Sequence, residues 1–210
     1  MIKYLGKNTV PAAGWVFALD SYPQAFRRYE NPMFFIARGW LYGGIPMFPK
    51  MRRIKQQLSH QAAEAVLLQG TSGVLSLLGE DGYPYGVPLS YVYRNGKLLF
   101  HCATKGHKLD ALRREEKCSF CVIGQDEIVP ERYTTRYRSV IAFGTAKILE
   151  DPTQKRAAIE ALATRFNPHD PAGREQEIRD SWDHLCLVEM TIVHMTGKQS
   201  KELAQEEGSL

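Results

Sequence analysis

Cationic side chains crowd the first turn of a short helix that the sequence predicts at about residues 106–116. The cations are Lys105, His107 and Lys108, and the acidic residues at the other end are Glu115 and Glu116. A helix start carries a partial positive charge and favours carboxylates, whereas its end favours cations. The inverted order predicts an anion such as phosphate at the helix start, where Gly106 would let it approach free N–H groups. A merely solvated basic face is the alternative.

His101 precedes these cations on the predicted strand "LLFHCA". Because side chains alternate across a strand, His101 shares a face with Leu99 and Ala103, opposite Phe100 and Cys102. An imidazole beside a bound anion could move a proton near neutral pH. The competing interpretation is a core histidine whose ring is satisfied by a backbone carbonyl.

A proline interrupts another predicted strand, "YGVPLSYVY". Pro88 has no N–H to donate to a ladder, so this strand is expected at an edge, at a bulge or beside a ligand. Backbone groups of Val87, Leu89 and Ser90 could then bond to a flat heterocycle. A simple edge strand explains the proline equally well.

Arg138 and Ser139 lie at the entrance of a long predicted strand, "YRSVIAFGTAKILE". A guanidinium there could clamp a phosphate through paired N–H donors. A surface arginine without a ligand is the commoner case.

The four cysteines are Cys102, Cys118, Cys121 and Cys186. Cys118 and Cys121 have C-x-x-C spacing within a predicted strand, where residues three apart face opposite sides. Joint metal binding is therefore not expected, and no second such pair completes a zinc site. We expect no metal, ordinary buried thiols and a reducing compartment.

Charge and hydropathy exclude several classes of protein. Residues 1–50 hold six Lys or Arg against two acidic residues, and the remainder holds 21 of each sign, so the net charge of +4 comes from the N-terminal part. A neutral main body argues against a nucleic-acid partner. The sequence contains no run of 18 apolar residues, so no membrane span is predicted. A secretory signal is poorly supported, and we therefore expect a cytoplasmic protein.

The order of elements predicts a mainly β fold with small helices. Ser59 is expected to cap a helix that Gly70 ends in the left-handed conformation. Asn95-Gly96 predicts a tight hairpin, and Gly144 predicts a bend or bulge. Six strands are expected, at "TSGVLSLL", "YGVPLSYVY", "LLFHCA", "CSFCVIG", "YRSVIAFGTAKILE" and "LCLVEMTIVHM". Their hairpin connections favour an antiparallel barrel over a parallel sheet.

Both ends of the chain differ in character from its centre. Residues 1–50 show no sustained period, and Met51 offers a second plausible start, so this part is interpreted as an N-terminal extension of uncertain role. A genuine arm that wraps the surface is the alternative. Residues 51–200 form the predicted domain, and residues 201–210 are expected to be a polar tail.

The segments "DGYPYGVPLSYVYRNGKLLFHCATKGHKLDALRREEKCSFCVIG" and "YRSVIAFGTAKILED" resemble the pyridoxamine 5′-phosphate oxidase-like flavin-binding split barrels, in particular the nitroimidazole-resistance (Nim) branch. The resemblance covers residues 51–200. It implies a six-stranded antiparallel split β-barrel with short flanking helices. It also implies a homodimer that binds FMN at the subunit interface.

The resemblance further implies roles for individual residues. His101 matches the histidine proposed as the active-site residue of that branch, and Lys108 would take the cofactor phosphate. Residues expected to line the flavin are Val87, Pro88, Leu89, Ser90, His101, Cys102, Ala103, Thr104 and Gly106, with Arg138 and Ser139 entering from the partner subunit. The arginines that bind a second phosphate in the oxidases proper have no evident counterpart here, which speaks against vitamin B6 oxidation.

The function expected from these features is an FMN-dependent oxidoreductase of the reductase type. Its substrates would be small electrophiles such as nitroaromatic compounds. Electrons would come from NAD(P)H. Because the chain has no dinucleotide-binding glycine fingerprint, this donor would bind only transiently. The alternatives are an oxidase like pyridoxamine 5′-phosphate oxidase, or a module that binds flavin or haem without turnover. A third option is that the groove takes a larger deazaflavin.

Overall fold

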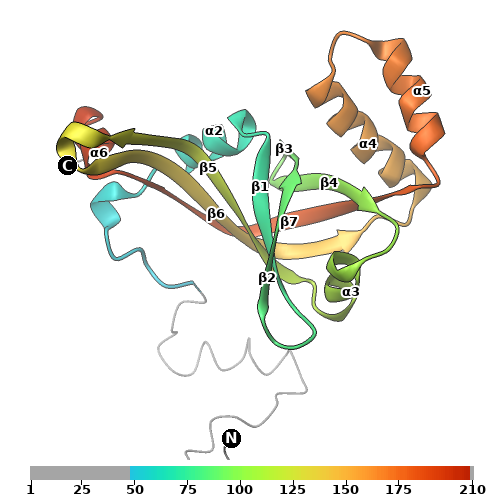
Figure 1. The fold of residues 1–210 in the computed structure, drawn as a ribbon, viewed down its shortest axis with the longest axis horizontal. Coiled ribbons are helices and arrows are strands. Elements are labelled where there is room, and N and C mark those ends of the chain that lie inside the picture. Colours follow the sequence, from blue (N-terminus) through green and yellow to red (C-terminus); the bar gives the residue numbers. More distant parts are fainter. Residues whose placement is uncertain (1–47, 209–210) are drawn as a thin grey trace, which may run out of the picture. The chain divides into compact units, whose positions relative to one another are not determined.

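An antiparallel sheet dominates the computed structural model, which describes residues 48–208 (Figure 1). Within this part of the chain seven strands form one sheet in the order β2-β1-β5-β6-β7-β4-β3. The strands are β1 (Ser72–Leu78), β2 (Pro84–Ser90), β3 (Val92–Arg94), β4 (Lys97–Ala103), β5 (Lys117–Val129), β6 (Thr134–Ile148) and β7 (Leu185–Gln199). The predicted mainly β class is confirmed, and the unclosed ladder of strands is that of a split barrel.

Short helices flank the sheet. They are η1 (Ile54–Gln56), α2 (His60–Gln69), α3 (His107–Arg114), η2 (Pro130–Arg132), α4 (Pro152–Phe166), α5 (Pro171–Ser181) and α6 (Lys201–Glu206). None of these helices is long and apolar enough to cross a membrane. The predicted extension at residues 1–50 lies outside the described residues as far as position 47.

The seventh strand arises because the predicted strand "YGVPLSYVY" is broken at Tyr91. The part before Tyr91, β2, pairs with β1, and the part after it, β3, pairs with β4. These two strands are the opposite edges of the sheet. Because a single residue joins them, the sheet must curl until its edges meet, and this curl makes the barrel.

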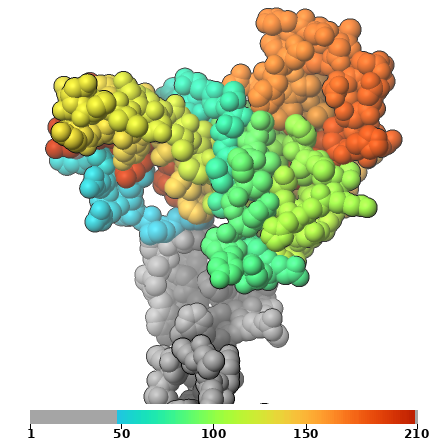
Figure 2. Space-filling model, in the orientation of Figure 1, coloured from blue at the N-terminus to red at the C-terminus, as the bar shows by residue number. Residues whose placement is uncertain are grey.

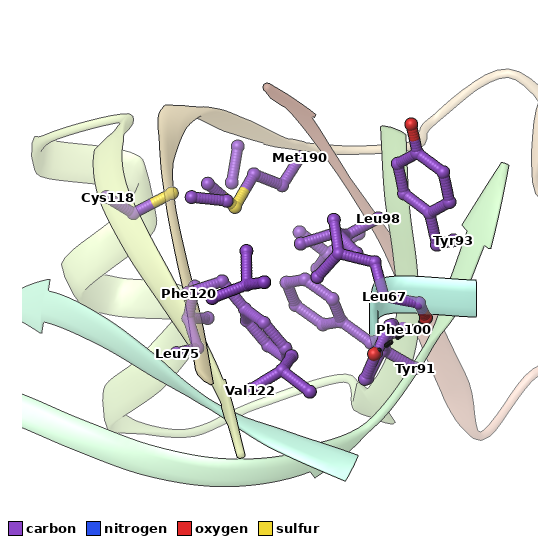
Figure 3. Close-up of a cluster of buried hydrophobic side chains, with 14 of the residues drawn as sticks. Leu67, Leu75, Tyr91, Tyr93, Leu98, Phe100, Cys118, Phe120, Val122 and Met190 are labelled. Carbon is purple, nitrogen blue, oxygen red and sulfur yellow. Dashed lines mark hydrogen bonds between the residues drawn. The ribbon is translucent and has the colours of Figure 1, made fainter. Parts of the chain in front are cut away.

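Tyr91 is held in place by α2. Its side chain is 0% exposed, and its hydroxyl donates a hydrogen bond to the carbonyl oxygen of Leu67 at 2.8 Å (Figure 3). A Cβ at Gly70 would lie 2.5 Å from the Tyr91 hydroxyl oxygen. Gly70 has an extended backbone, with φ −63° and ψ 148°, so the predicted left-handed ending is wrong. The glycine is required by the close approach of Tyr91.

Two cores lie on the two faces of β4 and β7. The larger core fills the barrel between the sheet and α2, and Figure 3 shows Phe100, Phe120 and Met190 packed inside it. The smaller core lies under α4 and α5 and includes Leu99 and Leu187. Alternation along β4 therefore separates two environments, as predicted from the sequence.

Local signals in the sequence explain several boundaries. The Ser59 hydroxyl accepts a hydrogen bond from Ala62 N at 3.1 Å at the start of α2. Asn95 and Gly96 have φ of 51° and 75°, which confirms the predicted hairpin turn. The register between β6 and β7 shifts at Gly144, where a Cβ would lie 2.0 Å from the Thr191 carbonyl oxygen.

Other segments are more ordered than predicted. The expected loop "QDEIVPERYTTR" is largely paired, because β5 and β6 extend as a hairpin as far as η2. Residues 201–206 were expected within a polar tail but form α6, whose Leu203 and Ala204 are 4% and 0% exposed. Such a short helix has too few apolar positions to show a period.

Replacing Tyr91 by phenylalanine tests the contact that holds the curled sheet to α2. Tyr91→Phe leaves the buried Leu67 carbonyl without its donor and is expected to lower the free energy of unfolding by about 1–3 kcal/mol. Urea unfolding measures this change. Tyr83→Phe is the matched control, because Tyr83 is 73% exposed and its loss should have little effect. Equal stability of the two variants would contradict the role of Tyr91.

Candidate functional site

A cavity of about 570 Å³ collects several of the predicted site residues. Its walls come from the end of β4, the start of α3, the facing sides of α4 and α5, and the start of β7. The lining residues are His101, Cys102, Ala103, Lys108, Ile159, Ala163, Glu177, Ile178, Ser181, His184 and Leu185. Such a volume suits a small organic ligand.

The end of β4 supplies one wall of this cavity. His101 and Ala103 are exposed, whereas Cys102 is half-buried against the barrel core. Their neighbours earlier on the strand, Leu99 and Phe100, are buried. β4 thus runs from a packed interior to an accessible end. The three residues of this end, 101–103, line the cavity.

Lys108 enters the cavity from the first turn of α3. The residue that precedes this helix, Gly106, has φ +134°, a conformation that residues with a Cβ rarely adopt. No side chain caps the helix start, so its first N–H groups remain available to a ligand. A half-buried cation and an uncapped helix start together suit an anion.

The predicted inversion of charge along α3 is only half right. The helix ends at Arg114, with Arg113 and Arg114 in its last turn, where cations are favourable. Glu115 is already extended and accepts a hydrogen bond from Lys117 N at 3.0 Å. The unusual cations are therefore confined to the first turn, which also holds the favourably placed carboxylate of Asp110, and the expected end of the helix at residue 116 is wrong.

The pKa of Cys102 depends on its burial in the cavity wall and on the charge of Lys108. Burial raises the pKa of Cys102 to about 11, and the positive charge of Lys108 opposes this rise. Burial also raises the pKa of Cys186, which pairs with Cys102 across β4 and β7. Both cysteines are free thiols. Lys108 therefore lies near enough to the wall that carries Cys102 to affect the pKa of this thiol.

None of the residues predicted on β2 lines this cavity. Val87 and Leu89 pack against the barrel core, whereas Pro88 and Ser90 are exposed on the other face. Pro88 is on an edge strand, which agrees with its missing N–H. Thr104, also predicted at the site, is exposed on the connection from β4 to α3.

One aromatic contact joins β2 to the start of α3. The ring of Tyr85 meets the ring of His107 edge-on, with centroids 4.5 Å apart. This contact brings β2 beside the helix that carries Lys108. His107 itself does not line the cavity.

Arg138 and Ser139 lie at the opposite end of the sheet. Along β7, Leu185 pairs with Ala103 of β4, whereas Gln199, fourteen positions later, pairs with Arg138 of β6. Arg138 donates to Gln199 Oε1 at 3.3 Å and pairs with Glu207 at 2.5 Å. One chain therefore does not bring Arg138 to the cavity.

The sequence did not indicate the helical half of the cavity. Glu177 and Ser181 of α5 face it and are joined by a hydrogen bond from the Ser181 hydroxyl at 2.8 Å. His184 lies just before β7. Their segment shows no strong period, and only the packing of α5 on α4 brings them to His101.

A larger cavity of about 760 Å³ lies on the helical pair α4 and α5. Its lining includes Arg156, Arg179 and Trp182 but none of the predicted site residues. Figure 2 shows these helices as a lobe beside the residues around position 100. We place the functional site in the smaller cavity because there the proton-transfer group, the cation and the uncapped helix meet.

Solved structures share this fold at low sequence identity. A candidate 5-nitroimidazole antibiotic resistance protein from Bacteroides thetaiotaomicron is 23% identical, with a TM-score of 0.57 over 68% of this chain and 86% of its own. A FAD-binding protein from Mesorhizobium loti is 23% identical, with a TM-score of 0.52 over 69% and 97%. The FAD and haem binding protein from Mycobacterium smegmatis is 21% identical, with a TM-score of 0.58 over 73% and 80%.

Comparison with sequence families gives the assignment. No curated protein sequence gives a significant match. The family model described as pyridoxamine 5′-phosphate oxidase matches residues 59–199, which is well over half of the chain and contains every strand of the sheet. This protein therefore belongs to the pyridoxamine 5′-phosphate oxidase family.

Proposed function

We propose that the protein is an FMN-dependent oxidoreductase of the reductase type that acts on small electrophiles such as nitroaromatic compounds. The observation that carries this proposal is the cavity that His101 of β4 lines together with the half-buried Lys108 at an uncapped helix start. The family assignment and the flavin named for two of the similar structures support it.

The residues present fit a flavin mononucleotide. Lys108 and the first N–H groups of α3 would hold its phosphate, and Gly106 keeps the approach to those groups free of a side chain. A Cβ built on Gly106 would meet no atom within 4 Å, so its role is conformational, set by φ +134°. Apolar contacts from Ile159, Ala163 and Leu185 would exclude water around the ligand.

When bound, the flavin would supply the electron transfer. His101 is exposed in the cavity and can hold a proton for a substrate that takes up electrons. The cavity provides one lysine and, among its described lining residues, no arginine. This composition favours substrates without a phosphate group over pyridoxamine 5′-phosphate.

A homodimer would complete the site. Arg138 and Ser139 can approach the cavity only from a second copy, because they lie at the far end of β6 and β7. Ser139 pairs with Ile123 on a sheet face that also carries Val74 and Ile141, and these three apolar side chains are 66%, 39% and 41% exposed. We propose that this apolar sheet face packs against its copy, which would bring Ser139 to the interface.

Removal of the Lys108 ammonium tests the phosphate site. Lys108→Ala is expected to weaken FMN binding about 10- to 100-fold, because a charge-assisted hydrogen bond contributes roughly 1.5–3 kcal/mol. Titration of the apoprotein with FMN, followed by flavin fluorescence, measures the affinity. Lys105→Ala is the control, since Lys105 is exposed and outside the cavity. Unchanged affinity in the Lys108 variant would refute this placement of the phosphate.

Charge on the apolar sheet face tests the dimer. Ile123→Glu should shift the protein to a monomer and reduce flavin occupancy, because a carboxylate would be buried at the interface. Light scattering measures the oligomeric state, and the flavin absorbance at about 450 nm measures the flavin occupancy. Leu68→Glu on α2 is the control, as Leu68 is 53% exposed and lies off this face. A dimer that persists in the Ile123 variant would show that another surface is used.

Turnover separates the reductase from its alternatives. The flavin-loaded protein is expected to oxidise NAD(P)H when a nitroaromatic acceptor is supplied without oxygen. His101→Gln should lower kcat more than it weakens FMN binding, because the imidazole is assigned to proton transfer. Oxygen-dependent oxidation of pyridoxamine 5′-phosphate would instead support the oxidase, and a haem spectrum without turnover would support a binding module.

A further inference from the structure

Two of the four cysteines lie directly opposite each other across the ladder between β4 and β7. The register of the two strands pairs Cys102 with Cys186. The preceding pairs that face the barrel core are Leu98 with Met190 and Phe100 with Val188, all buried. Because side chains alternate along each strand, the Cys102–Cys186 pair is the next member of this row. Both thiols therefore point to the same face of the sheet.

Their separation suits a disulfide bond. Residues opposite each other in an antiparallel ladder have Cα atoms about 4.5 or 5.5 Å apart, depending on the type of pair. A disulfide accepts Cα separations of about 4.4–6.8 Å. Cys102 and Cys186 can thus be joined by side-chain rotation alone. Each thiol also influences the pKa of the other.

The remaining cysteines do not share this arrangement. Cys118 faces the barrel core and is 9% exposed, and its thiol points to the Gly144 carbonyl oxygen at 3.8 Å. Cys121 lies on the opposite face of the same strand, between Val74 and Ile141. These two thiols point away from each other and serve as internal controls.

Access to the Cys102–Cys186 pair comes through the cavity. Cys102 lines it, and Cys186 follows the lining residue Leu185. Both cysteines are only half-buried, because the barrel core ends at this level of the sheet. A small reagent that enters the cavity can therefore reach the pair, whereas Cys118 is enclosed.

We propose that Cys102 and Cys186 form a reversible dithiol–disulfide couple that reacts with small-molecule disulfides. The thiolate of one cysteine attacks one sulfur of the external disulfide and releases its first thiol. The other cysteine then attacks the mixed disulfide, forms the Cys102–Cys186 bond and releases the second thiol. Two electrons pass from the pair to the external disulfide, and the two protons of the pair end on the released thiols.

Burial makes both thiols of the pair weakly ionised at neutral pH. It raises the pKa of Cys186 although the charges of Lys155, Arg113 and Lys108 oppose the rise. Burial likewise raises the pKa of Cys102 to about 11. The reactive thiolate is a minor species at neutral pH, so the rate should rise about tenfold per pH unit between roughly pH 7 and 9.

Peptide mapping of the full-length protein tests the proposal. After incubation with oxidised glutathione, acid quenching and alkylation, trypsin separates the cysteines into peptides 98–105, 118–132 and 180–198. Mass spectrometry without reduction should show 98–105 linked to 180–198 with the loss of two hydrogens. Excess reduced glutathione should reverse the link, and its yield should not require bound flavin.

Three variants sharpen the result. Cys121→Ser should keep the link, whereas Cys102→Ser and Cys186→Ser should abolish it and leave a stable glutathione adduct on the remaining thiol. Non-reducing electrophoresis of the denatured, oxidised protein should show the mass of one chain, which distinguishes a link within one chain from a link between two copies. Persistent adducts on wild-type Cys102 or Cys186 without the cross-link, or a link that involves peptide 118–132 instead, would overturn the proposal.

Discussion

The curl of the sheet into a split barrel depends on one buried tyrosine. Tyr91 is the single residue between the two edge strands of the sheet, and its hydroxyl is fixed to the last turn of α2 through Leu67. Its backbone N–H also bonds to the Thr71 carbonyl oxygen at 3.2 Å, at the start of β1. The edges of the sheet, the helix that covers its interior and the first strand thus meet at this residue. Gly70 makes this possible because a larger residue would occupy the space of the hydroxyl.

The same curl of the sheet positions the candidate site. Once the edges meet, β2 lies beside α3, where Tyr85 contacts His107. The connection from β4 to α3 is short, so His101 and Lys108 remain close although one is on a strand and the other on a helix. The packing of α4 and α5 on the outer face of β4 then completes the cavity. The chemistry of the site therefore depends on a curl that is fixed elsewhere in the barrel.

The sequence predicts this fold where period and local geometry carry the information. Alternation in β4 and the Asn95-Gly96 turn are local properties, and both were predicted. The break at Tyr91 was not, because the alternation of Val87, Leu89, Tyr91 and Tyr93 continues through it. Only the change of pairing partner, from β1 to β4, reveals the break. The left-handed helix ending predicted at Gly70 was wrong for a similar reason, since the role of this glycine depends on a residue 21 positions later.

The site was predictable to the extent that it lies on one continuous segment. His101, Cys102, Ala103 and Lys108 are close in sequence and line one cavity, whereas Glu177 and His184 reach it through tertiary packing alone. Alternation on β4 also divides this segment between two environments, with His101 toward α5 and Cys102 toward Cys186 and the core. A strand end that leaves the core can expose both faces at once. This is why one cavity can present a proton-transfer group and a thiol pair only one residue apart.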